Sequence, residues 1–147
     1  MRRVSSGIST ATLVPDRNVA AEELKAVNTL LAALTPFFHM DKSLLLSSLV
    51  MFLEVASYDR RVLLAGRPNR MGITKLSQKV GVAVATGSRL VTNLEGQLEL
   101  LDVFSDPDNY RAKCPTLSLK GKEMVAQLNR AISKPAAQST VGHSEVP

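Results

Sequence analysis

A small set of hydroxyl and cationic side chains in this chain could bind nucleic acid. Ser88 and Thr92 carry hydroxyls that can hydrogen-bond to base edges, and Arg89 can bind guanine through two parallel hydrogen bonds. Arg111 and Lys113 lie further along the chain and can contact phosphate. These residue types indicate recognition of an anionic polymer.

The sequence gives no support for catalysis. Ser, His and Asp occur, but no spacing arranges them as a nucleophile with its base, and no glycine-rich phosphate loop is present. His39 has no second His or Cys nearby, so we interpret it as a junction residue and not as a metal ligand. We therefore expect no enzymatic activity, no metal site and no cofactor.

Two helices are expected to position the first group of residues. Thr74–Val80 predicts a short helix with Thr74 as its N-cap, ended by Gly81 in the left-handed conformation. A second helix should follow to about Leu98, with an apolar stripe on one face. The stripe consists of Leu90, Val91, Leu94 and Leu98.

A hairpin and a closing helix are expected next. Asp106–Asn109 is rich in turn formers, so Leu100–Phe104 and Arg111–Thr116 can pair as two strands. Pro115 confines the second strand to an edge. A closing helix should begin at Leu119, and Arg111 and Lys113 should lie on the hairpin.

This order of parts, with several of its residues, resembles the MarR-type bacterial transcription regulators. The resemblance covers about Leu44–Ile132. It implies a mainly α fold with a small β-hairpin wing, a winged helix-turn-helix with flanking dimerisation helices, which binds double-stranded DNA as a homodimer. The matching segments are Leu76–Val82, Thr86–Glu95, Asp106–Asp108, Arg111–Lys113 and Leu117–Gly121.

The resemblance implies roles for individual residues. Residues of the second helix match positions that approach the major groove, and Arg111 matches a wing arginine that enters the minor groove. Together with the residues that open the first helix, they form the expected DNA-binding set. The set is Thr74, Lys75, Val84, Ala85, Thr86, Ser88, Arg89, Thr92, Arg111 and Lys113.

Departures from the family pattern suggest a second hypothesis. Ala83 stands where a capping Ser or Thr is usual, which removes about 1 kcal/mol of helix stability. Gly87 stands where an apolar side chain is usual, which costs about another 1 kcal/mol and some core packing. The alternative is a winged-helix protein-interaction module, an adaptor or antagonist of another regulator. A third hypothesis, implied by the family, is a sensor of a small molecule that no residue here identifies.

Composition indicates one small soluble domain. The chain has 147 residues, of which 45% are hydrophobic and 21% charged. We expect a folded domain over residues 16–134, with disordered segments at 1–15 and 135–147. The apolar run Leu44–Ala56 is too short to cross a membrane, and a single cysteine, Cys114, fits a reducing cytoplasm. A redox role for Cys114 would require an exposed thiol near positive charge.

Positive charge is concentrated next to the expected helix-turn-helix. The net charge is +5, and Asp59–Lys79 contains six basic residues and one acidic residue. This stretch leads into the helix-turn-helix, so we expect its cations to contact phosphate. The basic residues are Arg60, Arg61, Arg67, Arg70, Lys75 and Lys79.

Flanking helices complete the expected fold. A first helix, ended by Thr35-Pro36, has an apolar seam at 3-4-3 spacing that suits a dimer. Asp41 should cap a largely buried helix that runs to about Leu64. The seam consists of Leu24, Val27, Leu31 and Leu34, and the last helix has a stripe of Val125, Leu128 and Ile132.

Overall fold

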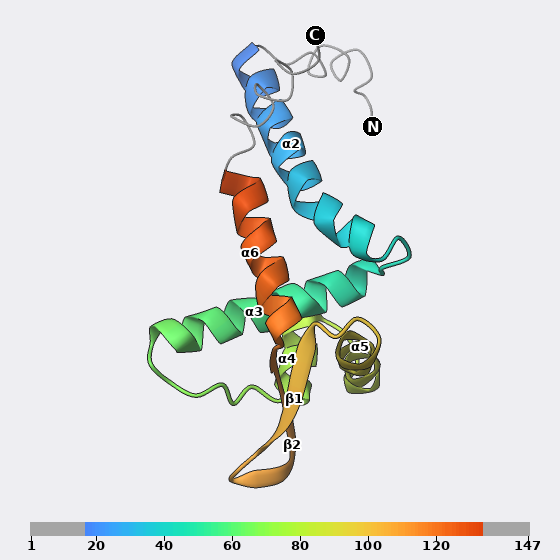
Figure 1. Ribbon diagram of the computed structural model, residues 1–147, viewed down its shortest axis with the longest axis vertical. Helices are drawn as coiled ribbons and strands as arrows, with labels where there is room; N and C mark the ends of the chain where they lie inside the picture. The colour runs from blue at the N-terminus through green and yellow to red at the C-terminus, as the bar shows by residue number, and fades with distance from the viewer. Residues whose placement is uncertain (1–16, 134–147) are drawn as a thin grey trace, which may run out of the picture. The chain divides into compact units, whose positions relative to one another are not determined.

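The computed structural model describes residues 17–133, so the segments 1–15 and 135–147, expected to be disordered, lie outside the described residues. The mainly α fold with a two-stranded hairpin is confirmed (Figure 1). The elements are α2 (Arg17–Met40), α3 (Leu46–Leu64), α4 (Ile73–Val80), α5 (Val84–Gly96), β1 (Leu101–Asp106), β2 (Asn109–Leu117) and α6 (Leu119–Ser133). None of the helices described could span a membrane.

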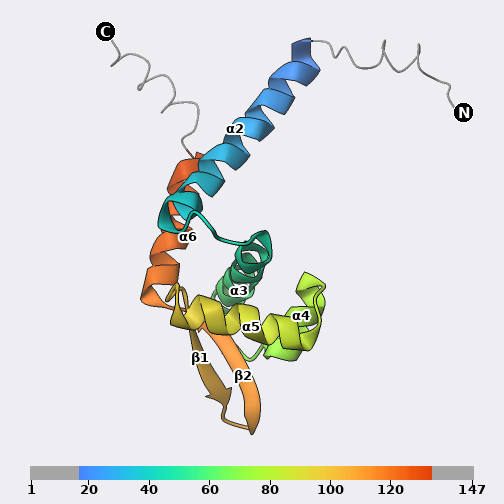
Figure 2. The same cartoon turned by 90° about the vertical axis from the view of Figure 1, so that its right-hand side faces the viewer.

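The chain forms two compact units whose boundaries fall inside α2 and α6. One contains residues 36–129, and the other contains residues 17–35 and 130–133 of the described chain. The larger unit holds α3, α4, α5 and the hairpin, which projects from the helices beside α5 (Figure 2). It therefore contains every expected DNA-binding residue.

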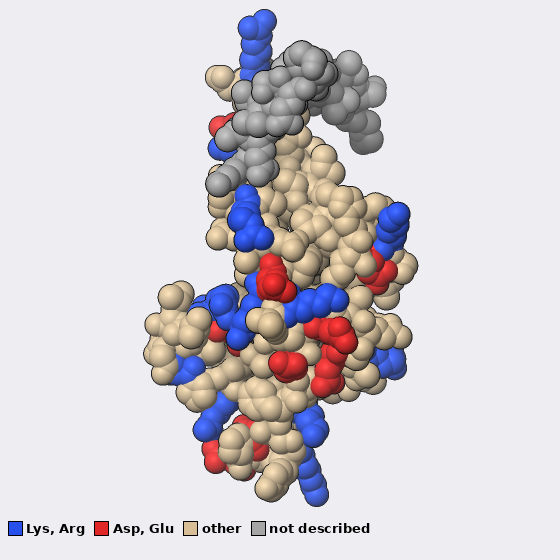
Figure 3. Space-filling view, viewed as in Figure 1, with Lys and Arg blue, Asp and Glu red and all other residues tan. Residues whose placement is uncertain are grey.

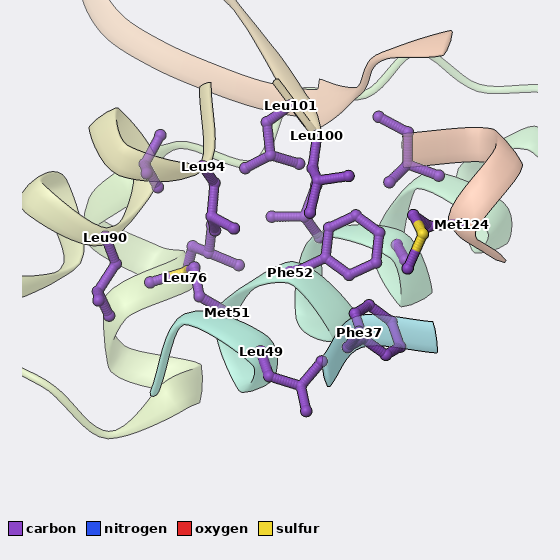
Figure 4. Close-up of a cluster of buried hydrophobic side chains, with 14 of the residues drawn as sticks. Phe37, Leu49, Met51, Phe52, Leu76, Leu90, Leu94, Leu100, Leu101 and Met124 are labelled. Carbon is purple, nitrogen blue, oxygen red and sulfur yellow. The ribbon is translucent and has the colours of Figure 1, made fainter. Parts of the chain in front are cut away.

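The core of the larger unit is built around α3. Phe52 of α3 is fully buried and meets Phe37 edge to face, with ring centroids 5.8 Å apart (Figure 4). Burial of such side chains is the main stabilising term of a small domain. The other core side chains labelled in Figure 4 are Leu49, Met51, Leu76, Leu90, Leu94, Leu100, Leu101 and Met124.

Two expectations about the first helices are wrong. Thr35-Pro36 does not end the first helix, because α2 continues through Pro36 to Met40. The Thr35 hydroxyl donates to the carbonyl of Leu31 at 2.6 Å in the turn that precedes the proline. Asp41 does not cap α3, which begins only at Leu46. Instead its carboxylate accepts the Ser43 amide at 3.0 Å and closes a turn.

Helix α3 is less buried than expected. Phe52 and Val55 lie in the core, but Leu46, Val50 and Leu53 on another face are exposed. The expected end at Leu64 is confirmed. A helix with leucines around most of its circumference can thus face the core on one side only.

The ends of α4 and α5 differ in part from the sequence expectation. Thr74 is not the N-cap of α4, because the helix begins at Ile73 and Gly72 takes the cap position without a side-chain hydrogen bond. Gly81 ends α4 with φ +92°, as predicted. Ala83 is the uncapped N-cap of α5, as expected, and α5 ends at Gly96.

Gly87 is packed closely against α4, which corrects the expectation of lost packing. A Cβ atom at Gly87 would lie 1.8 Å from the Oγ of Ser77 and 2.8 Å from its Cβ. Ser77 is fully buried on α4, and its hydroxyl donates to the carbonyl of Ile73 at 2.7 Å. The space of the missing side chain is therefore occupied by Ser77, so this glycine permits the α4–α5 contact.

The hairpin contains a bulge next to its tip. Ser105 pairs with Lys113, but the next residue of β1, Asp106, pairs with Asn109. The segment Tyr110–Ala112 therefore has no partner in this register, and a bulge redirects the side chains that it contains. The side chain of Asn109 accepts the Arg111 amide at 3.2 Å and fixes the start of this segment.

A serine cap joins the hairpin to α6. Ser118 accepts the amide of Gly121 at 3.0 Å and donates to the carbonyl of Glu99 at 2.6 Å. A Cβ at Gly121 would lie 2.2 Å from the Leu100 carbonyl oxygen, so α6 starts in direct contact with the chain before β1. The predicted start at Leu119 is confirmed.

Candidate nucleic-acid interface

The outer face of α5 carries the side chains expected to read DNA. Ser88 and Arg89 are exposed, whereas Leu90 and Leu94 on the opposite face are buried. The predicted division of this helix into an apolar and a polar face is thus confirmed. The other exposed residues of the expected set on α5 are Val84, Ala85 and Thr92, and Thr86 is half-buried.

A groove of about 460 Å³, which we call the wing groove, lies where α4, α5 and β2 meet. Its cations are Lys75, Arg111 and Lys113, and none of the described residues that line it is acidic. Predicted DNA-binding residues from three separate elements therefore share one positive concavity. The lining residues are Gly72, Ile73, Thr74, Lys75, Gln78, Val84, Ser88, Arg111, Ala112 and Lys113.

A second groove, which we call the α5 groove, follows the same helix and measures about 580 Å³. Ser88 lines both grooves and so connects them. Arg89 lines the α5 groove, and its guanidinium donates to the Thr86 hydroxyl at 3.3 Å. Its lining residues are Ala85, Ser88, Arg89, Thr92, Asn93, Gly96 and Gln97.

The sequence did not identify several residues that line these grooves. Gln78 lies one helical turn after Thr74, and Asn93 and Gln97 follow Arg89 at four-residue steps. This spacing is a signal that could have placed them beside the expected residues. Asn93 donates to the side chain of Gln97, so the two amides form a hydrogen-bonded pair.

The basic stretch Asp59–Lys79 contains two arginines that are already paired. Arg60 lies 3.0 Å from the carboxylate of Asp59, and Arg70 forms an ion pair with Asp108 at the wing turn. The hydrogen bond that Arg70 donates to Asp108 raises the pKa of the guanidinium. These two cations are therefore less available to phosphate than the sequence predicts.

The remaining basic residues are exposed. Arg67, Lys75 and Lys79 take part in none of the ion pairs of residues 17–133, and Arg61 donates to the Ser57 hydroxyl at 3.0 Å. Figure 3 shows Lys and Arg on both flanks of the hairpin and acidic side chains near its tip. Positive charge thus borders the wing, while the turn itself is acidic.

Cys114 lacks the features of a redox sensor. Its side chain is fully buried on β2. Burial, reinforced by Asp106, raises the pKa of the Cys114 thiol, although Arg70 opposes the shift. A protonated and inaccessible thiol is a poor nucleophile, so the structure gives no support to a redox switch at this residue.

Comparison with solved structures establishes the fold. Rv1404 from Mycobacterium tuberculosis is 16% identical, has a TM-score of 0.58, and the match covers 99% of this chain and 84% of that one. A MepR mutant from S. aureus bound to an oligodeoxyribonucleotide is 13% identical, with a TM-score of 0.59 and coverage of 91% and 86%. YusO from Bacillus subtilis is 12% identical, with a TM-score of 0.54 and coverage of 94% and 84%.

This chain has a winged-helix fold. It is the fold that the resemblance to MarR-type regulators implied, and the segments that carry the resemblance lie in α4, α5, the hairpin and the start of α6. The sequence matches no family model and none of the curated proteins. At these low identities the structural likeness concerns the fold and not the function.

Proposed function

We propose that this protein is a transcriptional regulator that binds double-stranded DNA as a homodimer. The wing groove carries the proposal, because it joins the exposed face of α5 to the cations of the wing without an acidic lining residue among those described. The likeness to MepR, which was solved bound to an oligodeoxyribonucleotide, supports it. Positive concavities that follow a helix suit the phosphate backbone of a duplex.

Each part of the interface has its own role in this proposal. The exposed face of α5 enters the major groove, where Ser88 and Arg89 contact base edges. Lys75 and Lys113 contact phosphates on either side of the wing groove. Arg111, on the bulge of β2, reaches the neighbouring minor groove.

The homodimer is supported by the smaller unit, residues 17–35 and 130–133. Leu24, Val27 and Leu31 of α2 are each about 60% exposed, which is a large apolar surface for so few residues. A second copy would bury this seam and place two α5 helices on successive major grooves.

The dimer can be tested by its mass in solution. Light scattering should give about twice 15.9 kDa. Leu31→Asp should give the monomer mass, with Glu23→Gln as an exposed control, whereas a monomeric wild type would contradict the dimer.

The electrostatic part of the proposal predicts a steep salt dependence. Each phosphate contact contributes a slope of about −0.9 to log K against log salt. Lys113→Gln should weaken binding to all duplexes and reduce the slope by about one contact per subunit, while Lys120→Gln on α6 should change neither. Affinity that is independent of salt would contradict the proposal and favour a protein partner.

Substitutions of two arginines can distinguish sequence recognition from general affinity for DNA. Arg89→Ala should cost about 1–3 kcal/mol on a preferred sequence and reduce discrimination among sequences. Arg111→Ala should weaken all sequences more evenly, with some bias against AT-rich flanks. Selection from random duplexes with both variants, each checked for an unchanged melting temperature, tests this assignment. An unchanged motif with Arg89→Ala and a lost motif with Arg111→Ala would reverse it.

One of the two observations that favoured a protein-interaction module has another explanation in the structure. It rested on Ala83 and Gly87, and Gly87 is explained by its contact with Ser77. Only the missing cap at Ala83 remains. A cytoplasmic location follows from the proposed role in transcription, and a small-molecule effector stays a prediction.

A further inference from the structure

A polar network joins the end of α3, the segment before α4 and the base of the wing. Asp59 of α3 is only 8% exposed, and its carboxylate accepts three hydrogen bonds. The Thr116 hydroxyl of β2 donates at 2.6 Å, the Asn69 amide at 3.2 Å and the Arg60 guanidinium at 3.0 Å. One carboxylate thus connects α3, the segment before α4 and strand β2.

Asn69 adds a second set of contacts to this network. Its amide nitrogen also lies 3.3 Å from the carbonyl oxygen of Pro115, next to Thr116 on β2. Its side-chain oxygen accepts the backbone amide of Met71, a core residue, at 3.2 Å. Asn69 therefore ties the wing strand to the chain that enters α4. We call Asp59, Asn69 and Thr116 the wing clamp.

The base of the wing packs into the core through Leu101 and Leu117, and the clamp adds polar attachments there. Among residues 17–133 the sheet has two strands, and a two-stranded hairpin is marginally stable by itself in water. Arg111 precedes Pro115 by four residues on β2, toward the wing tip, a span of at most about 13 Å in an extended strand. A tilt of about 10° at the base would therefore move the Arg111 backbone by about 2 Å. That displacement is enough to lose a hydrogen bond.

We propose that Asp59 and Asn69 are positioning residues that fix the direction of the wing and so determine where Arg111 meets DNA. The proposal rests on the DNA-binding function proposed above. Asp59 is too buried to touch a duplex and acts only through the strand that it holds. The clamp thus influences the contact between the wing and DNA without touching DNA itself.

The clamp should affect the wing and leave α5 in place. Leu90 and Leu94 pack α5 into the core, and Gly87 seats it against Ser77. None of these contacts involves a clamp residue. The ion pair between Arg70 and Asp108 near the wing tip is a second attachment, but it is exposed, and such pairs contribute little.

A matched pair of variants at Thr116 removes the clamp hydrogen bond with little change in volume. Thr116→Val deletes the hydroxyl that Asp59 accepts, and Thr116→Ser retains it. Asn69→Ala removes the remaining link to Pro115. Ser57→Ala, which removes an exposed hydroxyl of α3 bonded to Arg61, is the control. Melting temperatures establish that each variant folds.

Double-mutant cycles on a duplex test whether the clamp acts through the wing. Arg111→Ala should weaken binding about tenfold in the wild type, but about twofold or less in Thr116→Val or Asn69→Ala. In Thr116→Ser and Ser57→Ala the tenfold effect should persist. Arg89→Ala should have the same effect in every background. An Arg111→Ala effect that is undiminished in both clamp variants overturns the proposal, even though the wild type binds DNA.

A readout without DNA keeps the test independent of the proposed function. Residual dipolar couplings of backbone amides report the direction of β1 and β2 relative to α5. They should change in Thr116→Val and Asn69→Ala but not in Thr116→Ser, while α4 and α5 keep their relative direction. Unchanged wing couplings in both clamp variants would overturn the proposal whether or not the protein binds DNA.

Discussion

The two elements proposed to contact DNA, α5 and the wing, are held in place by different kinds of interaction. Leu94 and Val91 bury α5 in the apolar core, and the Gly87–Ser77 contact sets its distance from α4. The base of the wing also packs into the core through Leu101 and Leu117, but the wing is held in addition by hydrogen bonds to Asp59 and, near its tip, by an exposed ion pair. One element is thus positioned by apolar packing, and the other by apolar packing at its base together with polar contacts.

This difference predicts different sensitivities. Apolar packing depends steeply on side-chain volume and little on salt or on acid. Hydrogen bonds to a carboxylate depend on its protonation, and exposed ion pairs depend on ionic strength. We therefore expect volume changes to disturb α5 most and acid to disturb the wing first.

The largest effect is expected from a truncation in the core beneath α5. Leu94 is fully buried, so Leu94→Ala should lower the free energy of unfolding by about 2–5 kcal/mol through lost burial and a residual cavity. Phe104→Ala on the wing should cost about 1 kcal/mol or less, because that ring is 38% exposed. Urea unfolding of both variants measures the contrast, and equal losses would contradict it.

A methyl group at Gly87 should have the next largest effect. Gly87→Ala should cost roughly 1–3 kcal/mol, because its Cβ would collide with Ser77. Gly96→Ala in the same helix meets no atom within 4 Å and should stabilise by about 0.5–1 kcal/mol. Ser77→Gly should recover part of the loss in the double variant. If both alanine variants stabilise the protein, the close α4–α5 contact is wrong.

Acid should act on the wing through Asp59. Burial raises the pKa of the Asp59 carboxyl, but hydrogen bonds from Thr116, Arg60 and Asn69 outweigh it and hold the pKa below the usual value. The stabilisation is therefore present above about pH 3.9, the usual pKa of an aspartate in an unfolded chain, and is lost as pH falls through the lower folded value.

Removing one of these donors should narrow that window from its lower end. Thr116→Val leaves the burial and deletes a hydrogen bond, so the pKa of Asp59 should rise toward the unfolded value, and the acid loss of stability should become smaller and be complete at a higher pH. Carbon-13 titration of the Asp59 carboxyl measures the pKa, and Leu94→Ala serves as the control that leaves it unchanged. An Asp59 pKa that is the same in wild type and Thr116→Val would contradict this account of the wing base.

The smallest effect concerns the residue that links the two regions. Glu99 follows α5, precedes β1 and has φ +58°, a left-handed conformation that costs a side chain about 1 kcal/mol. Glu99→Gly should therefore stabilise by about 0.5 kcal/mol after the greater freedom of the unfolded chain is included. Glu95→Gly within α5 should destabilise by about 1 kcal/mol. Thermal unfolding distinguishes the two, and a destabilising Glu99→Gly would show that the strain is absent.

The sequence by itself determined the elements whose signals are local. The stripe of α5, the left-handed Gly81, the turn at Asp106–Asn109 and the start of α6 at Leu119 follow from residues within one or two turns of each other. Periodicity also divided α5 correctly into buried and exposed faces. Local conformational preference is a property of the chain itself, so these features need no knowledge of the fold.

Tertiary structure decided which side chains meet. The sequence predicted that Gly87 costs packing, but in the fold the Ser77 side chain fills the space of its missing side chain. Arg70 lies in the basic stretch of the sequence, but in the fold it pairs with Asp108, 38 residues away. Asp59 and Thr116, 57 residues apart, join only when α3 and β2 pack together. Such contacts depend on the distance and orientation of whole elements, which no local pattern of residues encodes.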